Sequence, residues 1–418
     1  AKLSANVGVQ ENEPRFLYTS SIHGDETTGY ILMLRLIDYL LTNFNSNDQV
    51  THLLKNMEIW INPLANPDGT YAAGNNSLYG ATRFNANNID LNRNYPDFQD
   101  GPHPDGNDWQ KETIEFMELA DSVSFIMSAN FHGGAEVFNY PWDTWATLHA
   151  DDDWWKLVGR EWADTVHKHA PAGYFDDEDN GITNGYAWYT LNGGRQDYMN
   201  YYHHCREVTL EISNTKLLPE SLLNDFWEYN YRSFLNYMSQ ALYGIAGTIT
   251  DSQTGLPLKA TVTIEDHDKD GSYVVSDSVT GGYFRPVAAG TYTITYSAPK
   301  YASKTIEQVK VVDYEQTLQD VSLVYTGAGV GDVLYSNQFI LAMNSIDNTL
   351  TITYSGNDSH QTVITLCDLS GRVKLRDEFK FGADNKTLAL PISEMANGVY
   401  IVNLTSDKFF ISTKILNR

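Results

Sequence analysis

Hydrophobic positions follow two different periods in the first 243 residues. Short runs rich in β-branched and aromatic residues predict buried strands, whereas longer stretches with apolar residues three or four apart predict helices. Strands that alternate with helices favour an α/β fold, with a mixed, mostly parallel sheet and helices on both of its faces. The expected strands are 16–20, 57–61, 125–131 and 208–212, and the expected helices are 28–43, 112–120, 152–169 and 217–243.

The pattern changes after Gly244. Short alternating runs separated by Gly, Asp and Pro turns predict a small antiparallel β-sandwich that ends near Tyr325. The segment 326–329 has the composition of a linker, and a second β-rich unit is expected from about Val333 to Arg418. Because 418 residues are too many for one ordinary core, we expect an α/β domain at 1–243 and two small all-β sandwich domains at 244–325 and 326–418.

The charge balance narrows the classes of partner. The chain has 28 Lys and Arg residues against 53 Asp and Glu residues, which gives a net charge of −25. Nucleic-acid phosphates and anionic membrane surfaces would be repelled, so neither is an expected partner. The charge fits a secreted protein that attracts cationic substrates, although simple solubility explains it equally well. No apolar run is long enough to span a bilayer, and a signal peptide is absent or was removed before residue 1.

Two histidines and a glutamate are the strongest candidates for chemistry. His23 and Glu26 follow one predicted strand and His132 follows another, and the carboxyl ends of parallel strands lie at one edge of a sheet. Two imidazoles and one carboxylate suit zinc, and three protein ligands leave a position open for water. Because the only two cysteines are far apart, neither a disulfide framework nor a cysteine metal site is expected. The cysteines are Cys205 and Cys367, and the histidines expected on the surface are His52, His103, His149, His167 and His169.

A pair of ligands three residues apart often arises by chance, but the chain carries further motifs in a fixed order. The stretch 83–96, RFNANNIDLNRNYP, resembles the signature of the zinc metallocarboxypeptidases, in the branch that includes carboxypeptidases E, N, D and M. The resemblance covers residues 1–243 and implies the metallocarboxypeptidase fold, with one zinc ion bound by His23, Glu26 and His132. Five more motifs resemble active-site segments of that family: HGDE at 23–26, NPDG at 66–69, SANFHGGA at 128–135, GGRQDY at 193–198 and TLEIS at 209–213.

The resemblance also implies roles for residues around the metal. Glu211 is the expected general base, which takes a proton from the attacking water and passes it to the leaving amine; the alternative is an ordinary carboxylate at a sheet edge. Arg83 is expected to stabilise the oxyanion, although a surface ion pair is the simpler explanation. Asn92 and Arg93 are expected to bind the terminal carboxylate of the substrate, because a planar guanidinium matches two carboxylate oxygens. That contact implies an exopeptidase.

Three further residues concern closure and specificity. Tyr189 lies 22 residues before Glu211, which matches the mobile tyrosine of the family, although it is one of 27 tyrosines in the chain. Asp143 lies 11 residues after the second zinc histidine in a Tyr-Pro-Trp-Asp context, where relatives that cleave basic residues carry an acid. Gln196 also matches a residue of that pocket. The resemblance therefore implies substrates that end in Lys or Arg, while a helix cap or loop aspartate is the alternative for Asp143.

Residues 244–325 resemble the transthyretin-like sandwich that follows the catalytic domain in this branch. The resemblance rests on 281–285, GGYFR, and on 289–292, AGTY. Nothing catalytic is visible there. The run 266–271 has the spacing of a calcium loop, but its twelfth position is Asp277 and its flanks have the pattern of strands, so we expect a solvated hairpin tip.

Residues 333–418 resemble the C-terminal sorting domain of proteins exported by the bacterial type IX route. The matching pieces are short: 368–372, 397–402 and 414–416. A generic β-sandwich binding module is the alternative. If the resemblance holds, the protein is secreted or attached to the cell surface, with the export machinery as a partner of this domain.

The interpretation that these motifs favour is a zinc carboxypeptidase, acting as a monomer, that releases a C-terminal Lys or Arg. Only 22 residues precede His23, fewer than the family usually has, so we expect early elements of the catalytic domain to be missing. Two other hypotheses stay open. One is a catalytically silent homologue that binds peptide tails, and the other is a zinc amidohydrolase that acts on small acylamino acids or cell-wall peptides.

Overall fold

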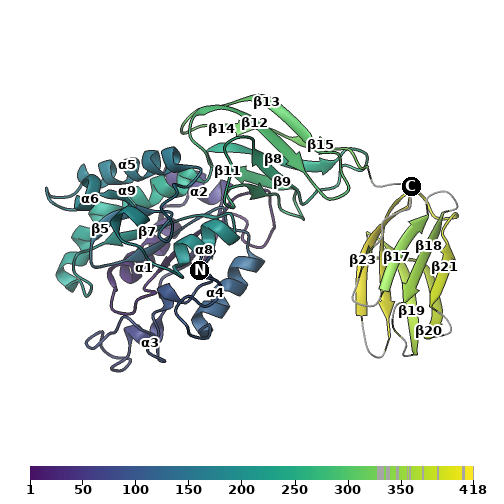
Figure 1. The fold of residues 1–418 in the computed structure, drawn as a ribbon, viewed down its shortest axis with the longest axis horizontal. Coiled ribbons are helices and arrows are strands. Elements are labelled where there is room, and N and C mark those ends of the chain that lie inside the picture. Colours follow the sequence, from purple (N-terminus) through teal and green to yellow (C-terminus); the bar gives the residue numbers. More distant parts are fainter. Residues whose placement is uncertain are drawn as a thin grey trace. The chain divides into compact units, whose positions relative to one another are not determined.

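The computed structural model describes residues 1–326, 334–335, 339–344, 348–354, 356, 359–369, 371–383, 386–406 and 410–417. The chain divides into two compact units, residues 1–325 and residues 326–418 (Figure 1). The expected linker residues 327–329 lie outside the described residues.

A seven-stranded sheet forms the centre of the first unit, in the order β1-β3-β2-β4-β7-β5-β6. Neighbouring strands run parallel except for β1 with β3 and β5 with β7, which confirms the predicted mixed, mostly parallel sheet. The strands are β1 (Lys2–Leu3), β2 (Arg15–Ser20), β3 (Glu58–Asn62), β4 (Met127–His132), β5 (Glu136–Tyr140), β6 (Ile182–Asn184) and β7 (Arg206–Ile212).

Helices cover both faces of this sheet, as predicted (Figure 1). Side chains alternate along each strand, so Phe16 and Tyr18 join the large core on one face while Leu17 joins a smaller core on the other. The large core is completed by α1 (Thr28–Asn43), α2 (Asp48–Asn56), α5 (Asp152–His167) and α9 (Leu223–Gln240), and the smaller core by α4 (Lys111–Ser122) and α8 (Arg195–Tyr202). Shorter helices are α3 (Pro67–Thr70), η1 (Leu91–Arg93), α6 (Asp177–Asn180), α7 (Gly185–Trp188) and η2 (Glu220–Leu222).

Several elements differ from the sequence prediction: β1, β6, α2 and α8 were not expected, and two further differences have a clear physical reason. The helix expected over 217–243 begins only at Leu223, because Pro219 precedes a separate short turn, η2. Strand β5 was not predicted, since its five residues are all buried and show no alternation. Only three residues separate it from β4, so periodicity alone gave no second strand there.

The register of the sheet brings three strand ends to one edge. Ser20 at the end of β2 lies opposite Phe131 of β4. His132, the last residue of β4, lies opposite Glu211 of β7. Residues placed at or just after these ends therefore meet above the carboxyl edge of the sheet, where ligand sites of open α/β sheets lie.

Residues 244–325 form a β-sandwich, as predicted. One sheet has the order β10-β9-β12-β13, and the other has the order β11-β8-β14 with β15 also paired to β8. Ile249, Val262, Ile294 and Leu323 fill the space between them. The strands are β8 (Gly244–Asp251), β9 (Thr261–Ile264), β10 (Val274–Val275), β11 (Gly282–Arg285), β12 (Gly290–Ser297), β13 (Lys304–Val311), β14 (Gln316–Leu318) and β15 (Val321–Leu323).

A buried ion cluster joins this sandwich to the α/β part of the same unit. Asp151, at the start of α5, binds Arg206 of β7 at 2.8 Å and Arg285 of β11 at 2.8 Å. Asp268 also pairs with Arg285 and its side chain is only 2 % exposed, whereas Asp266 and Lys269 are exposed, so the expectation of a solvated tip at 266–271 is confirmed only in part. The expectation of a surface position is wrong for His149, which is buried beside Asp151 and accepts a hydrogen bond from its backbone N–H.

The second unit is another β-sandwich, which confirms the predicted second β-rich domain. Its described residues form two four-stranded sheets, β16-β17-β18-β21 and β20-β19-β22-β23. Leu350, Ile352, Ile364 and Val402 belong to the core between them. The strands are β16 (Leu334–Tyr335), β17 (Phe339–Asn344), β18 (Thr349–Tyr354), β19 (His360–Asp368), β20 (Val373–Phe381), β21 (Thr387–Pro391), β22 (Gly398–Thr405) and β23 (Phe410–Asn417).

Candidate active site

Three buried side chains converge at the carboxyl edge of the seven-stranded sheet. Glu26 Oε2 lies 3.0 Å from His23 Nδ1 and 2.9 Å from His132 Nδ1, and the two nitrogens are 3.1 Å apart. A triangle of this size lets each atom lie about 2.0–2.2 Å from one shared ion, the usual distance for zinc with histidine and carboxylate ligands. The donor set therefore fits zinc. It forms a His-Glu-His zinc site, as predicted.

Surrounding groups hold the two imidazoles in the orientation that this site needs. Asp90 accepts a hydrogen bond from His23 Nε2 at 3.0 Å, which leaves Nδ1 available as a ligand atom. The side-chain amide of Asn130 lies 2.8 Å from His132 Nε2. Burial alone would raise the pKa of Asp90, but His23 and Arg83 outweigh it and hold that pKa well below its ordinary value. Asp90 is therefore a carboxylate that orients a ligand.

The loop between β2 and α1 carries His23 and Glu26 and is fixed by close packing. A Cβ on Gly24 would come within 2.3 Å of the backbone of Gly69 in α3, so only glycine fits at this position. Asn66 donates a hydrogen bond to the carbonyl of Ile22 in the same loop. The NPDG segment at 66–69 thus supports the metal loop from outside it.

Arg83 lies directly beside the metal ligands. Its Nε donates to Asp90 Oδ2 at 2.8 Å, and its Nη1 lies 3.2 Å from His23 Nδ1 and 3.7 Å from Glu26 Oε1. The side chain is 30 % exposed, so it is neither fully buried nor a free surface group. Asp90 thus fixes the guanidinium and His23 together.

Glu211 occupies a central strand, because β7 lies between β4 and β5. The alternative considered from the sequence, an ordinary carboxylate at the edge of a sheet, is therefore wrong. Leu210 and Ile212 on either side belong to the large core, so Glu211 faces the opposite side of the sheet. Its register partner is the zinc ligand His132.

The environment of Glu211 favours proton transfer. The side chain is 7 % exposed, and among the described residues its Oε2 has no hydrogen-bond partner. Burial, and after it the charge of Glu26, raises the pKa of Glu211 well above its ordinary value, while Lys216 and Arg83 act in the opposite direction. A buried carboxyl group with a free oxygen next to a metal site has the properties of a general base.

Asn92 and Arg93 lie in the short helix η1. Asn92 is buried, and its Oδ1 accepts a hydrogen bond of 3.0 Å from the backbone N–H of Arg195 in α8. Arg93 donates to the carbonyl of Asn92 at 2.7 Å. Within the described part of the chain, no carboxylate forms an ion pair with Arg93, so its guanidinium is available to an anionic ligand.

Asp143 lies in the segment after β5 and is buried among polar side chains. Its Oδ1 accepts hydrogen bonds from Asn139 Nδ2 and Gln196 Nε2, both at 3.0 Å. Burial raises the pKa of Asp143 to about 6, against the influence of Asn139 and Arg93. A Cβ on Gly185 would come within 1.9 Å of Asp143 Oδ1, so the glycine leaves room for this carboxylate. The side chain is 2 % exposed and, among the described residues, has no cationic partner within ion-pair distance.

Tyr189 follows α7 and is 44 % exposed. Burial of part of the side chain, then the charges of Glu211 and Asp143, raise its pKa to about 12, and Arg93 and Arg83 oppose that shift. The tyrosine therefore lies among the predicted site residues and keeps its phenolic proton at neutral pH.

Several residues of this region had no role assigned from the sequence, and three of them show why. Asp90 orients His23, Asn139 contacts Asp143, and Gly185 makes space for it. Asp90 lies inside the recognised motif RFNANNIDLNRNYP, and Asn139 directly precedes YPWD. Their positions in or next to these motifs could have marked both residues as candidates. The contacts that define their roles depend on the tertiary structure.

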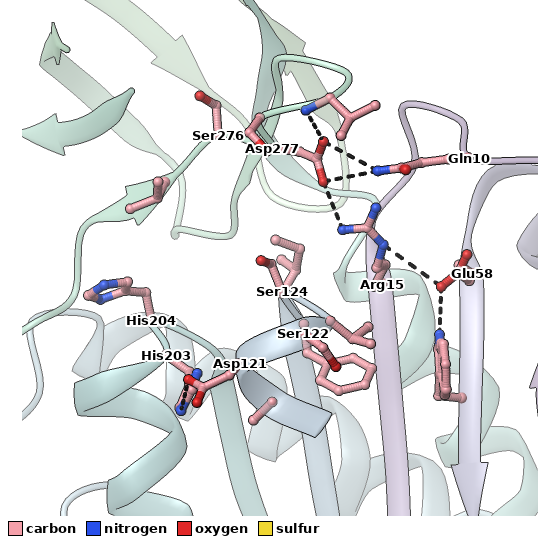
Figure 2. A pocket seen from close by; sticks show the side chains of 18 of the residues that line it. Gln10, Arg15, Glu58, Asp121, Ser122, Ser124, His203, His204, Ser276 and Asp277 are labelled. Carbon is pink, nitrogen blue, oxygen red and sulfur yellow. Dashed lines mark hydrogen bonds and ion pairs between the residues drawn. The ribbon is translucent and has the colours of Figure 1, made fainter. Parts of the chain in front are cut away.

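A cavity of about 760 Å³ lies away from this site (Figure 2). It is lined by residues at the amino ends of β2 and β4 and by the sandwich segment 274–279. Figure 2 shows Arg15 between Glu58 and Asp277. The two ion pairs measure 3.8 Å and 3.1 Å, and Lys2 also pairs with Glu58 at 2.6 Å, so two cations balance the two carboxylates. The cavity contains no zinc ligand and none of the predicted site residues.

The fold and the site define a zinc hydrolase of the α/β class, with two histidines and one glutamate at the carboxyl edge of the sheet. The family described as "Zinc carboxypeptidase" matches residues 1–233. The chain belongs to this family and is a zinc metallocarboxypeptidase. Two further families match later parts of the chain: "Carboxypeptidase regulatory-like domain" at 244–324 and "Secretion system C-terminal sorting domain" at 344–418. The exact domain boundaries at 243 and 325 stay a prediction.

Similar proteins belong to the branch predicted from the motifs. The chain is 35% identical to carboxypeptidase M of Mus musculus over 303 residues, which are 69% of this chain and 67% of that protein. It is 33% identical to the carboxypeptidase N catalytic chain of Homo sapiens over 362 residues, or 77% of each chain. It is 35% identical to carboxypeptidase D of Homo sapiens over 322 residues, which are 72% of this chain but 22% of that longer protein.

The C-terminal family bears on location. A type IX sorting domain implies a secreted or cell-surface protein, which confirms the expected destination. Within the described residues, none of the helices combines the length and the apolar composition needed to cross a bilayer.

Proposed function

We propose that this carboxypeptidase releases Lys or Arg from the C-terminus of peptides and proteins. The observation that carries the proposal is the buried carboxylate of Asp143, which has only amide donors and, in the described structure, no cationic partner. A buried carboxylate without a counter-ion is costly, and a guanidinium or ammonium group of the substrate would remove that cost. The comparisons support the carboxypeptidase class and leave this preference as our proposal.

Each remaining residue has a step that its position supports. Zinc, when bound by His23, Glu26 and His132, supplies a Lewis acid that polarises the scissile carbonyl and lowers the pKa of water. Glu211 accepts the proton of the attacking water and delivers it to the leaving amine. Its Oε2, which has no hydrogen-bond partner in the described part of the chain, is the atom available for this transfer. Arg83 donates hydrogen bonds to the oxyanion of the tetrahedral intermediate.

A second group of residues has the role of orienting the substrate. Arg93 binds the terminal carboxylate of the substrate in a bidentate manner, and Asn92, anchored to α8, donates a further hydrogen bond. Gln196 holds Asp143 in place through one end of its amide, while the other end accepts from the backbone N–H of Thr209 in β7. Tyr189 closes over the bound peptide and excludes water.

The test compares hippuryl-Arg, hippuryl-Lys and hippuryl-Phe with zinc-loaded protein. We expect the highest kcat/KM for the two basic substrates, and we expect Asp143→Ala to lower activity on them by about 10-fold or more while sparing hippuryl-Phe. Asn192 is exposed and accepts a hydrogen bond from Thr144, the residue after Asp143, so Asn192→Ala is the matched control and should keep the preference. Equal rates on Phe-ended and Arg-ended substrates would remove Asp143 from the specificity pocket. Bound zinc without turnover of any substrate, including a muropeptide, would favour the peptide-binding homologue.

A further inference from the structure

Asp197 is a buried carboxylate that has no role in the mechanism above. It is the third residue of α8, and it is 2 % exposed. Its Oδ1 and Oδ2 each lie 3.0 Å from the backbone nitrogen of Asp143, and Oδ2 also accepts a hydrogen bond of 2.9 Å from the backbone N–H of Thr144. The side chain of Asp197 therefore holds the backbone of the segment that carries Asp143.

The two residues before Asp197 contact groups that are expected to bind the substrate. Gln196 Nε2 donates a hydrogen bond of 3.0 Å to Asp143 Oδ1. The backbone N–H of Arg195 donates one of 3.0 Å to Asn92 Oδ1. The first turn of α8 thus holds Asp143 by both its side chain and its backbone, and it connects Asp143 with a residue of the expected carboxylate subsite.

The burial of Asp197 is costly, and helix stability alone does not explain it. Burial, and after it the charge of Asp143, raises the pKa of Asp197 well above its ordinary value, while the backbone N–H groups of Thr144 and Asp143 oppose that shift. Among the described residues, no cation forms an ion pair with Asp197. An acid in the first turn of a helix interacts favourably with the helix dipole from an exposed position as well, without the cost of burial.

We propose that Asp197 is a positioning residue for substrate specificity, which holds the backbone at Asp143 and Thr144 so that the carboxylate of Asp143 faces the side chain of the substrate. The inference rests on the proposed preference for Lys and Arg. Without Asp197, two buried N–H groups lose their acceptor and the segment is free to shift. Thr144 Oγ1 still lies 2.8 Å from Asp97 Oδ2, so we expect a local shift and an intact fold.

The test measures kcat/KM for hippuryl-Arg and hippuryl-Phe with zinc-loaded Asp197→Ala. We expect the Arg-to-Phe ratio to fall by about 10-fold or more, chiefly through a higher KM for hippuryl-Arg. A variant that merely unfolds more easily loses activity on both substrates equally, so its ratio stays constant. Asp225→Ala removes an exposed acid from the first turn of α9 and is the control that should keep the ratio.

Asp197→Asn keeps one acceptor oxygen, so its ratio should lie between those of the natural protein and Asp197→Ala. It also replaces Asp197→Ala in the test if the alanine variant does not fold. An unchanged ratio in the variant that is measured, alongside a lower ratio in Asp143→Ala, would overturn the positioning role and leave the proposed preference intact.

A double variant shows whether Asp197 acts through Asp143. Adding Asp197→Ala to Asp143→Ala should change the ratio no further, because the group that Asp197 positions is already absent. A further fall in the double variant would overturn the proposal. If Asp143→Ala by itself leaves the ratio unchanged, the proposed preference fails, and the positioning role of Asp197 fails with it.

Discussion

At the scale of single residues, Glu211 and Asp143 show that the surroundings of a carboxyl group decide which role it can have. Both are buried carboxylates whose pKa burial raises, yet their partners differ. Among the described residues, Glu211 keeps one oxygen without a hydrogen bond beside the metal site, whereas Asp143 receives two amide hydrogen bonds on one oxygen. The first arrangement suits proton transfer and the second suits a fixed charge that selects a cation.

Glu211→Gln tests the general base directly. The amide keeps the shape of the side chain but cannot accept the proton, so we expect kcat to fall by about 10²–10⁴-fold or more while bound zinc stays stoichiometric. Steady-state kinetics with metal analysis measures both quantities. Glu220→Gln, at an exposed position in η2, is the matched control and should leave kcat unchanged. A kcat near that of the natural protein would refute the assignment of Glu211.

The pKa of about 6 for Asp143 gives a pH prediction with a definite sign. Above pH 6 the carboxylate is charged and binds a cationic side chain, and as the pH falls through 6 it gains a proton and loses that attraction. We expect the ratio of kcat/KM for hippuryl-Arg to that for hippuryl-Phe to fall between about pH 7 and pH 5, since kcat/KM reports groups of the free enzyme. The ratio cancels titrations that both substrates share.

Asp143→Asn is the control for this profile. Its amide does not titrate, so the ratio should be low and independent of pH. A ratio that stays constant across this range in the natural protein would separate Asp143 from substrate recognition.

At the scale of elements, the site depends on loops that leave the carboxyl ends of parallel strands. His132 ends β4 and the loop after β2 carries His23 and Glu26, so the sheet sets the distances between ligands that are far apart in sequence. The loop after β2 has little freedom because it packs directly on α3. The contact between this loop and α3 therefore fixes the positions of His23 and Glu26.

Gly24→Ala tests this contact. The added Cβ would lie 2.3 Å from the backbone of Gly69, so the loop must shift and the ligands with it. We expect zinc affinity to fall by about 10-fold or more, measured by chelator competition. Gly8→Ala is the control, since no atom of the residues that the structure describes lies within 4 Å of its added Cβ. Equal zinc affinity in both variants would show that the loop tolerates the displacement.

At the scale of the whole molecule, the sandwich at 244–325 is joined to the catalytic part through buried charges. Asp151 from α5 is fully buried between Arg206 and Arg285, which come from the two parts of the first unit. Burial alone would raise the pKa of Asp151, but the two guanidinium groups outweigh it and hold the pKa well below its ordinary value. Its stabilising contribution is therefore present above about pH 4 and is lost as the pH falls below that value.

Asp151→Asn should destabilise this unit strongly. It leaves two buried guanidinium groups with less compensating charge, an effect that typically costs about 3–5 kcal/mol. Urea unfolding at pH 7, followed by fluorescence of the tryptophans, measures the change in midpoint. Asp153→Asn removes an exposed acid from the first turn of the same helix, and its cost should stay below about 1 kcal/mol. A midpoint shift no larger than that of the control would show that the cluster contributes little.

The sequence by itself determined the class of fold, the order of the motifs and the zinc ligands. Alternating periods record which face of each strand is buried, and that information is local. Catalytic motifs are likewise short segments, such as HGDE and RFNANNIDLNRNYP, whose residue types are dictated by the chemistry they perform. Expectations based on local pattern were confirmed for the sheet, for both sandwiches and for the His-Glu-His site.

Only the tertiary structure decided which distant groups share a charge or a hydrogen bond. The burial of His149 and Asp268, the support of Asp143 by Asn139 and Gly185, and the contact of Lys216 with Glu26 all join segments that are separate along the chain or hidden by folding. Electrostatic interactions and close packing depend on distances in space, and no periodicity of one strand or helix encodes them.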